Sequence, residues 1–394
     1  MFGLLVAVIY LCFISLGLPD SLLGAAWPQI YIDFNVPLSY QGILSMTIAV
    51  CTIISSLFSD FLTKKFGPAK VTTVSIFLTA SALIGFSFAN NFWILLLIGI
   101  PYGLGAGAID AALNNYVALH FKPRMMSWLH CMWGVGASIS PYIMGYALST
   151  SKGWSNGYLI VGCIQIVICI ISFISIPLWK KFDKVGISKE EDNKITTRKK
   201  ALTPKEIVHI KGAIPGFITF FCYCALESTT IAWGSSYLVI NNELSKDLAA
   251  NFASLFVIGI TIGRFINGFI ANKIHDWNII RMGQCIIVVG LILVFIPNNN
   301  YLTIIGLVIM GLGCAPIYPS IIHMTPTVYG KENSQAMIGV QMASAYLGSC
   351  FMPPLFGLIA NNFTISFFPF YILIFLSLMI IANETVVRTA INKK

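Results

Sequence analysis

The sequence predicts an all-α membrane protein in which twelve transmembrane helices form two pseudo-symmetric bundles of six. Three observations predict this fold class. The 394 residues are 57% hydrophobic and only 10% charged, whereas ordinary globular chains carry about 25% charged residues. Apolar runs of membrane-spanning length recur from one end of the chain to the other. Several short motifs occur twice, at a nearly constant separation.

The composition leaves too few polar groups to coat a water-facing surface, and the mean hydropathy is +0.82. We therefore expect lipid to cover much of the surface. A spanning helix needs about 20 apolar residues, and the recurrence of such runs excludes a single signal peptide or anchor. The first run shows no cleavage site and is expected to remain as a span. The twelve spans are expected at residues 4–32, 38–62, 70–89, 92–119, 124–149, 155–179, 210–239, 247–271, 278–296, 301–324, 333–360 and 364–387.

The connections between these spans are short and hold turn formers or charge, as at Asn90-Asn91. One connection differs, because residues 180–211 contain ten Lys and Arg and few apolar residues. Such a composition is typical of a solvated linker. We therefore expect an N-terminal six-helix bundle at 1–180, a cytoplasmic linker at 181–209 and a C-terminal six-helix bundle at 210–394.

The positive charges predict the orientation of the chain, because Lys and Arg concentrate in short cytoplasmic loops. With both termini in the cytoplasm, 22 of the 24 Lys and Arg lie on the inner side, and only Lys152 and Lys246 lie outside. The net charge of +9 is then a topology signal, so no nucleic-acid partner is expected. We expect a multi-pass, monomeric protein of the cell membrane, plasma or inner, in contact with the lipid bilayer.

The two halves of the chain repeat one another at four places, with offsets of 206 to 212 residues. A near-constant offset is expected if the chain folds as two similar bundles. Transporters built from two such bundles bind their substrate at the interface of the repeats, near the bilayer midplane. The paired motifs are Gly103-Leu-Gly105 with Gly311-Leu-Gly313, Asp20 and Trp27 with Glu227 and Trp233, Pro141 with Pro353, and residues 55–65 with residues 263–273.

Three acidic residues lie deep within the expected spans: Asp20, Asp110 and Glu227. A carboxylate at bilayer depth costs several kcal/mol, so it should face a cavity or a partner. Closing such a group off from water favours its protonated form, and readmitting water releases the proton. We therefore expect these three residues to carry protons during transport. The alternative is a buried acid that only bonds a neighbouring helix.

Polar residues beside these acids form a candidate substrate site. Asp110 and Asn114 are four residues apart, so both point from one face of a helix. His130 is suited to donate to a sugar hydroxyl or to titrate near neutral pH. The alternatives are a polar packing seam for the amides and a membrane-interface position for the tryptophans. The expected substrate-binding residues are Asp110, Asn114, Asn115, His130, Trp133, Trp27, Trp233 and Gln341.

Three cations, Lys64, Lys65 and Arg264, occupy matching inner ends of the second and eighth spans. We expect them to latch a cytoplasmic gate through helix-end contacts, and a purely topological role is the alternative. The ten cysteines show no metal-site spacing. No nucleotide-binding or zinc-protease motif occurs. We therefore expect no metal and no cofactor, with a proton gradient as the energy source.

At these motifs the chain resembles the major facilitator superfamily over nearly its whole length, and within it the fucose:proton symporter family of sugar transporters. The Asp20 segment, followed by Pro28-Gln29, is similar to that family's first-span acid and Pro-Gln pair. The fourth-span pattern is similar too, with Asp110 where the family usually has Glu. Residues 130–137 resemble a fifth-span segment that commonly has Gln and Asn at the positions of His130 and Trp133, and residues 63–67 resemble the basic loop.

The resemblance implies that Asp20 and Asp110 are the proton-coupling and substrate-binding acids. Together with the repeat, it predicts proton-coupled symport of a monosaccharide by alternating access. Proton-driven efflux of drugs or lipids is the alternative in the same broad class. A membrane-embedded enzyme is disfavoured because no nucleophile with its base is recognisable. A non-transporting sugar sensor would need a signalling part, and the linker is too short for one.

Overall fold

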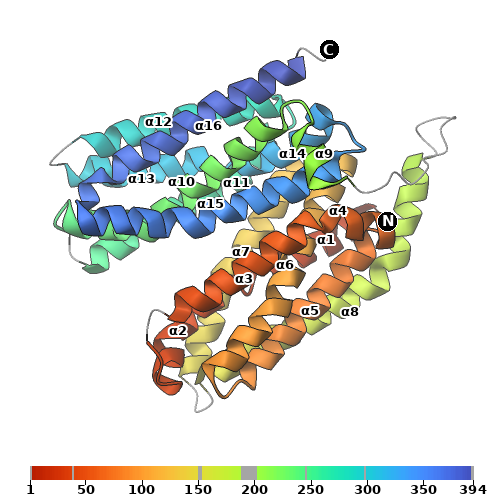
Figure 1. The fold of residues 1–394 in the computed structure, drawn as a ribbon, viewed down its shortest axis with the longest axis horizontal. Helices are drawn as coiled ribbons and strands as arrows, with labels where there is room; N and C mark the ends of the chain where they lie inside the picture. Colours follow the sequence, from red (N-terminus) through yellow and green to blue (C-terminus); the bar gives the residue numbers. More distant parts are fainter. Residues whose placement is uncertain are drawn as a thin grey trace. The chain divides into compact units, whose positions relative to one another are not determined.

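The chain folds into helices, as a computed structural model shows. No strand occurs in the part of the chain that the structure describes, and Figure 1 shows long helices running side by side in each half of the chain. The predicted fold class, an all-α membrane protein, is confirmed. The described residues are 2–37, 40–149, 153–187, 202–244, 246–296 and 299–391.

The helices follow the predicted spans closely. Those before the linker are α1 (Phe2–Gly17), α2 (Leu22–Asp33), α3 (Tyr40–Leu57), α4 (Ser59–Phe66), α5 (Pro68–Ser87), α6 (Phe92–His120), α7 (Pro123–Leu148) and α8 (Gly153–Ile187). Those after it are α9 (Pro204–Val208), α10 (Ala213–Ile240), α11 (Lys246–Ile270), α12 (Asp276–Phe295), α13 (Asn300–Cys314), α14 (Ile317–Tyr329), α15 (Ser334–Asn362), the 3-10 turn η1 (Ile365–Phe367) and α16 (Phe368–Ile391).

By length and composition, ten described segments could each cross a membrane. Two further helices complete the predicted set. Helix α7 has 26 residues, enough to span about 30 Å of hydrocarbon, but it is more polar than the ten. Helix α11 has 25 residues, and its described apolar part is Leu255–Ile270. Each of the twelve predicted spans thus coincides with one helix or with two consecutive ones.

Three of the predicted spans each consist of two consecutive helices with a break between them. Pro19 lies in the turn between α1 and α2, where a proline removes a helical hydrogen bond. Pro316 lies between α13 and α14 in the same way. The third break, at Phe58 between α3 and α4, contains no proline. The first interruption leaves Asp20 on a turn rather than within a continuous helix.

The predicted linker is described only at its ends, since residues 188–201 lie outside the described residues. Thr203 caps α9, because its hydroxyl accepts from Glu206 N while the Glu206 carboxylate accepts from Thr203 N at 2.7 Å. Just before it, Leu202 N donates to the carboxylate of Asp60 in α4, at 3.2 Å. The end of the linker is therefore bonded to the helix that follows α3.

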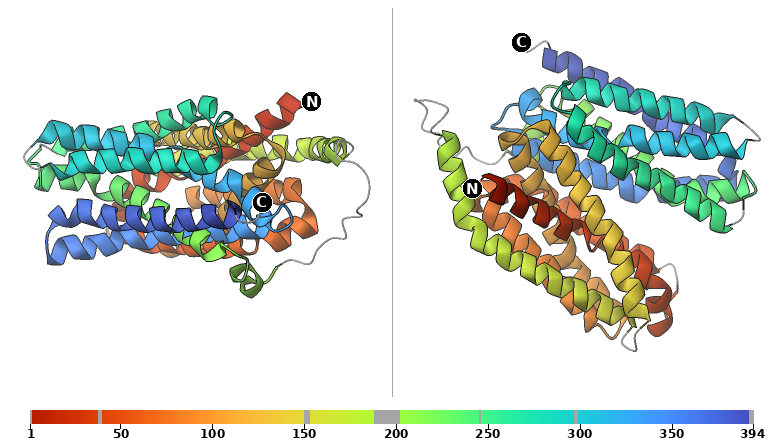
Figure 2. Two further views of the ribbon diagram at one scale, coloured as in Figure 1. Left: turned by 90° about the horizontal axis from the view of Figure 1, so that it is seen from above. Right: turned by 180° about the vertical axis from the view of Figure 1, so that it is seen from behind.

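The chain divides into two compact units. The first comprises Met1–Tyr116 and Leu129–Leu202, and the second Val117–Trp128 and Thr203–Lys394. Within the first unit α5 and α8 lie side by side, and within the second α12 and α13 do so (Figures 1 and 2). The turn that joins α6 to α7 groups with the second unit, although the rest of both helices belongs to the first.

Glycines bring helices into backbone contact at repeated places in both units. A Cβ atom at Gly103 of α6 would overlap the Ile48 carbonyl of α3, and one at Gly311 of α13 would overlap the Phe256 carbonyl of α11. Phe256 follows Ile48 by 208 residues, the offset of the sequence repeat. The two units therefore share one packing pattern. Two further pairs of glycine–carbonyl contacts recur in the two units. Gly105 with Ser75 matches Gly313 with Gly283, and Gly136 with Ile14 matches Gly348 with Phe221.

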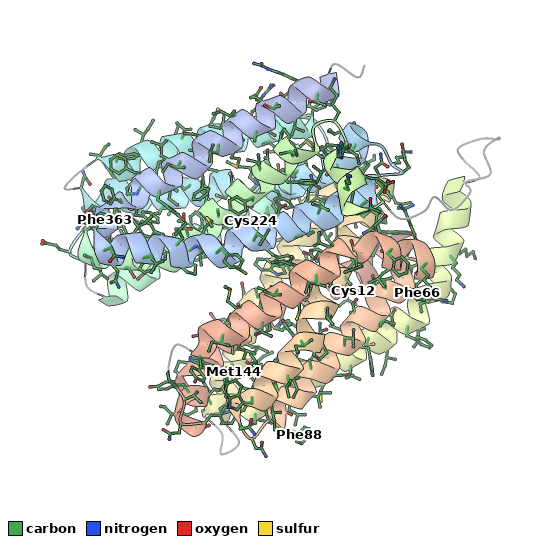
Figure 3. All side chains as sticks on the ribbon, viewed as in Figure 1. Cys12, Phe66, Phe88, Met144, Cys224 and Phe363 are labelled. Atoms are coloured by element: carbon green, nitrogen blue, oxygen red, sulfur yellow. The ribbon has the colours of Figure 1, made fainter. Side chains whose placement is uncertain are left out.

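The surface of the helices carries many large apolar side chains, as Figure 3 shows. Phe88 and Phe363 are each 76% exposed, whereas Cys12 and Met144 are fully buried. Such exposed rings are unfavourable in water and suit contact with lipid acyl chains. The exposure pattern agrees with helices that have lipid on the outside of each bundle.

Candidate functional site

A hydrogen-bonded chain of three buried side chains lies in the first unit. Asp110 and Asn114 project from one face of α6, and Asn114 Nδ2 donates to Asp110 Oδ1 at 2.7 Å. His130 of α7 reaches the same amide, with Nε2 lying 3.1 Å from Asn114 Oδ1. All three are at most 5% exposed. The sequence predicted each residue, and the structure joins them through Asn114.

The amide of Asn114 sets the direction of this chain. With Nδ2 facing Asp110, the amide oxygen faces His130 and can only accept, so Nε2 of His130 is the donor. The rings of His130 and of Phe13 on α1 are nearly perpendicular, with centroids 5.2 Å apart. Asn115 is also buried, 6% exposed, on the same helix. The cluster therefore offers a carboxyl, two amides and an imidazole within one bundle.

Asp20 lies on the turn between α1 and α2 and, unlike Asp110, is exposed. The indole of Trp133 on α7 donates from Nε1 to Asp20 Oδ2 at 2.7 Å. This bond depends on close helix approach, since a Cβ at Gly17 would overlap the Trp133 carbonyl. The contact gives Trp133 a polar partner, beyond the substrate-binding role that the sequence suggested for it.

The two acids of this unit are near enough to interact electrostatically, and Tyr102 of α6 interacts with Asp20 in the same way. Tyr102 was not predicted, although it directly precedes the repeated Gly103 motif, which was the available signal.

In the second unit Glu227 of α10 pairs with Arg264 of α11, at 3.3 Å between Oε1 and Nη2. Their side chains are 15% and 5% exposed. The guanidinium also lies 6.0 Å from the ring of Tyr318 in α14, within cation–π range. The sequence assigned Glu227 to proton coupling and Arg264 to a gate, and the structure brings these two residues together.

The remaining predicted substrate residues are dispersed. Trp27 is 1% exposed and packs edge-on against Phe92 in the core of the first unit. Its side chain therefore lies in the packed interior rather than against water. Trp233 donates to the Pro353 carbonyl at 2.9 Å. Gln341 is fully buried and its Oε1 lies 2.9 Å from the Thr325 hydroxyl. Trp27 belongs to the first unit, and Trp233 and Gln341 belong to the second.

The predicted gate lysines make contacts within their own helix. Lys64 pairs with Asp60 one turn earlier at 2.8 Å, and the Lys65 ammonium lies over the rings of Phe61 and Phe66 at 5.4 and 5.3 Å. The first contact gives Oδ2 of Asp60, which is 3% exposed, a charged partner. Among the described residues, no group of three His, Cys, Asp or Glu could hold a metal ion.

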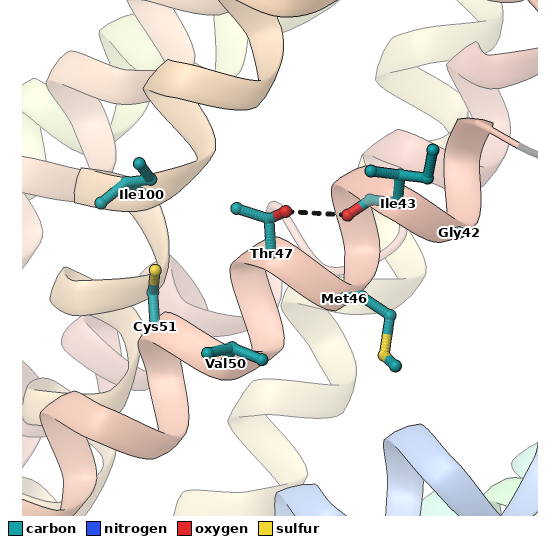
Figure 4. Close-up of a pocket in the computed structure, with 7 residues that line it drawn as sticks. All are labelled: Gly42, Ile43, Met46, Thr47, Val50, Cys51 and Ile100. Atoms are coloured by element: carbon teal, nitrogen blue, oxygen red, sulfur yellow. Dashed lines mark hydrogen bonds between the residues drawn. The ribbon is translucent and has the colours of Figure 1, made fainter.

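An apolar groove lies on α3 and α6 of the first unit, with a volume of about 640 Å³. Thr47 contributes the one side-chain oxygen among the lining residues of the groove. Its hydroxyl donates to the Ile43 carbonyl of the same helix at 2.9 Å (Figure 4). The groove therefore offers hydrocarbon contacts and little hydrogen bonding. Its lining residues are Gly42, Ile43, Met46, Thr47, Val50, Cys51 and Ile100.

Comparison with known proteins identifies the family. A family model described as the Major Facilitator Superfamily matches residues 9–240 and 216–388. The chain belongs to the Major Facilitator Superfamily. Members of this superfamily and the structural neighbours are transporters, so the chain is a multi-pass membrane transporter and not an enzyme. The sequence-based assignment to this superfamily is confirmed.

Several superfamily relatives align over most of the chain. Bypass of stop codon protein 6 of Saccharomyces cerevisiae is 24% identical over 91% of this chain and 77% of its own length. The glucose/mannose transporter GlcP of Bacillus subtilis is 21% identical over 90% of this chain and 88% of its own length. The quinolone resistance protein NorA of Staphylococcus aureus is 23% identical over 83% of this chain and 82% of its own length.

Solved structures of superfamily members share the fold. FucP, a fucose:proton symporter of E. coli, was crystallised in the outward conformation and aligns with a TM-score of 0.79, 14% identity and coverage of 98% of both chains. The proton:xylose symporter XylE aligns with a TM-score of 0.78 and 10% identity, over 97% of this chain and 94% of its own. At such identities the likeness establishes the fold alone.

Proposed function

We propose that this transporter carries out proton-coupled symport of a monosaccharide by alternating access. The observation that carries the proposal is the buried chain of Asp110, Asn114 and His130. A sugar offers hydroxyls that both donate and accept, and a carboxyl, an amide and an imidazole match that pattern. The fucose, xylose and glucose/mannose transporters among the similar proteins support the same substrate class.

Protons would be carried by Asp20 and Asp110. Asp20 is exposed, so it can exchange a proton with water, whereas Asp110 is closed off. A substrate hydroxyl that displaces Asn114 from Asp110 would change the stability of that carboxyl's charged form. Substrate and proton binding would then be linked through one side chain, and linkage is reciprocal.

The proposed substrate is neutral. Arg264 is the deep cation of the second unit, and it already pairs with Glu227. A substrate carboxylate would have to compete for that guanidinium, and separating a buried pair costs about 3–5 kcal/mol. In the first unit the described site residues are acids, amides and a histidine. These groups favour hydroxyls over an anionic sugar acid.

The topology and organisation that the sequence predicts form part of the proposal. The bundles would be residues 1–180 and 210–394, joined by a cytoplasmic linker at 181–209. Both termini would lie in the cytoplasm of a cell whose plasma or inner membrane holds the protein as a monomer. The positive-inside distribution of Lys and Arg supports this orientation.

A second candidate function is proton-driven efflux of drugs or lipids. The apolar groove of α3 and α6 supports it, because hydrocarbon surfaces bind such compounds with few hydrogen bonds. The similarity to the quinolone resistance protein NorA supports it too. The hydrogen-bonding cluster around Asn114 favours the sugar, because sugar hydroxyls can replace the bonds within the cluster and a hydrophobic drug cannot.

Reconstituted vesicles separate the two functions. Purified protein in liposomes is given an inward proton gradient and radiolabelled glucose, mannose, fucose or xylose, with an uncoupler as control. Uptake above the external concentration that the uncoupler abolishes is expected for at least one sugar. In a second arm, vesicles preloaded with a quinolone are tested for proton-driven release. Release without accumulation of any monosaccharide would replace symport by efflux.

A further inference from the structure

The turn that joins α6 to α7 is bound tightly to the second unit. The Asn267 amide of α11 donates to the Ser127 hydroxyl at 2.8 Å, and both residues are buried. The next residue, Gly268, has no room for a side chain because the indole of Trp128 lies against it. These contacts place residues 117–128 in the second unit, although the chain on either side belongs to the first.

His323 of α14 makes a further contact to this turn that depends on a proton. Its Nδ1 lies 2.7 Å from Asp276 Oδ2, and its Nε2 lies 3.3 Å from the Phe121 carbonyl oxygen. A carbonyl only accepts, so Nε2 must carry a hydrogen. The close Nδ1–carboxylate contact needs a second hydrogen, on either the imidazole or the carboxyl group. With both contacts formed, the pair therefore holds two protons.

We propose that His323 and Asp276 form a proton-dependent latch that holds the α6–α7 turn on the second unit. When the pair loses one proton, the remaining hydrogen is held between Nδ1 and the Asp276 carboxylate, because a charged acceptor makes the stronger bond. Nε2 then presents a lone pair to the Phe121 carbonyl, and the contact becomes repulsive. Low pH favours the docked turn, and raising the pH favours its release.

The other charged groups near α14 are paired with one another or exposed. On the helices packed against α14, the described charged side chains are Asp276 and Arg281 of α12, Glu227 of α10, and Glu384 and Arg388 of α16. Arg281 and Glu384 form a bidentate pair at 2.6 Å, and Glu227 pairs with Arg264. On the turn itself His120, Lys122 and Arg124 are exposed. Asp276 is thus the charged group bonded to His323.

The latched turn is continuous along the chain with the two helices that bear the candidate site. This connection does not depend on which substrate is carried. The turn continues backward into the helix that bears Asp110 and Asn114, and forward into the helix that bears His130 and Trp133. Releasing the turn would free the ends of both helices. A proton bound at His323 would in this way bias the conformations available to the transporter.

Hydrogen exchange of the full-length protein, followed by mass spectrometry, tests the latch. Peptides covering residues 117–128 are compared at about pH 6 and about pH 8, the range in which histidine titrates. Wild type and variants are compared at the same pH, so the chemical pH dependence of exchange cancels. Opening of the turn is expected to increase by up to about tenfold per pH unit, since a single proton is linked to docking.

Three substitutions distinguish the latch from other causes. Asp276→Asn lets the amide donate to Nδ1, so neutral His323 keeps a hydrogen on Nε2. This variant should stay protected at both pH values. His323→Ala removes the contact and should exchange faster at both. His275→Gln, which changes an exposed neighbour, should behave as wild type.

Three results would each contradict the latch. Wild-type protection of the turn that does not change with pH would overturn the proposal. So would an Asp276→Asn variant that keeps the wild-type pH dependence, or a His275→Gln variant that loses it. If His323→Ala does not fold, the comparison of wild type, Asp276→Asn and His275→Gln still decides the outcome.

Discussion

At the scale of single residues, the candidate site is a set of side chains whose polar atoms satisfy one another. Asn114 is the central member, because it donates to Asp110 and accepts from His130. Asp20 is tied to Trp133 but remains exposed. One acid is thus accessible to water and the other is closed off. Two predictions follow from this difference.

Replacing Asp20 by Asn should abolish proton-driven accumulation while leaving sugar exchange across the vesicle membrane. An amide of the same size keeps an acceptor for Trp133 but cannot release a proton. Accumulation and counterflow are measured in the same vesicles, and accumulation should fall at least about tenfold. Asp33→Asn, at an acid bonded to Trp154 in a similar way, is the matched control. Undiminished accumulation by Asp20→Asn would remove this residue from the mechanism.

Replacing Asn114 by Leu should lower both stability and substrate response. Asp110 loses its 2.7 Å donor in a buried site, and such losses cost about 1–3 kcal/mol. Thermal unfolding should show a lower Tm, and addition of sugar should no longer raise it. If sugar still raises the Tm of the Asn114→Leu variant, the amide of Asn114 does not contact the substrate.

At the scale of helices, glycine positions determine where the backbone can approach. Gly136 of α7 faces the Ile14 carbonyl of α1, and a Cβ there would overlap it. Trp133 of the same helix α7 donates to Asp20, on the turn that follows α1. The indole–carboxylate bond therefore depends on a backbone contact one turn away. Gly145, on the same helix, has open space around it.

Gly136→Ala is expected to destabilise the protein by about 1–3 kcal/mol, the usual cost of overpacking. Gly145→Ala should leave the stability unchanged or raise it slightly, because alanine favours a helix over glycine. Differential scanning fluorimetry of the two variants measures the contrast on one helix. Equal Tm values for Gly136→Ala and wild type would contradict the close contact of α1 and α7.

At the scale of the whole molecule, one packing pattern is used twice. Gly103 against Ile48 in the first unit matches Gly311 against Phe256 in the second, and both partners are 208 residues apart. The repeat is thus a repeat of backbone contacts. The buried polar contacts differ between the units, since the first unit holds the Asp110 cluster and the second the Glu227–Arg264 pair. The two units therefore share their helix packing but not their buried polar contacts.

Because the contacts are equivalent, Gly103→Ala and Gly311→Ala should lower the Tm by similar amounts. A loss of about 1–3 kcal/mol is expected for each. Gly24→Ala and Gly234→Ala, where a Cβ meets no atom within 4 Å, are controls for the first and second units. A large loss from one glycine and none from the other would show that the two packing contacts are not equivalent.

The sequence by itself determined the helices and their repetition. Apolar runs must be helical in lipid because no water satisfies the backbone there, and residues four apart such as Asp110 and Asn114 share a face by helix geometry alone. Pro19 is a local cause of the break beside Asp20. These features are local, or periodic along the chain, and can be inferred without knowing which helices touch.

The tertiary structure decided which distant residues meet. Glu227 and Arg264 lie in separate predicted spans, and only the packing of α10 on α11 brings their side chains together. Trp27 resembles a site residue in the sequence, but packing places it in the core. His323 carried no signal at all until folding set Asp276 and the Phe121 carbonyl on its two nitrogens. Side-chain chemistry can be read from a sequence, but partners far apart along the chain depend on helix packing.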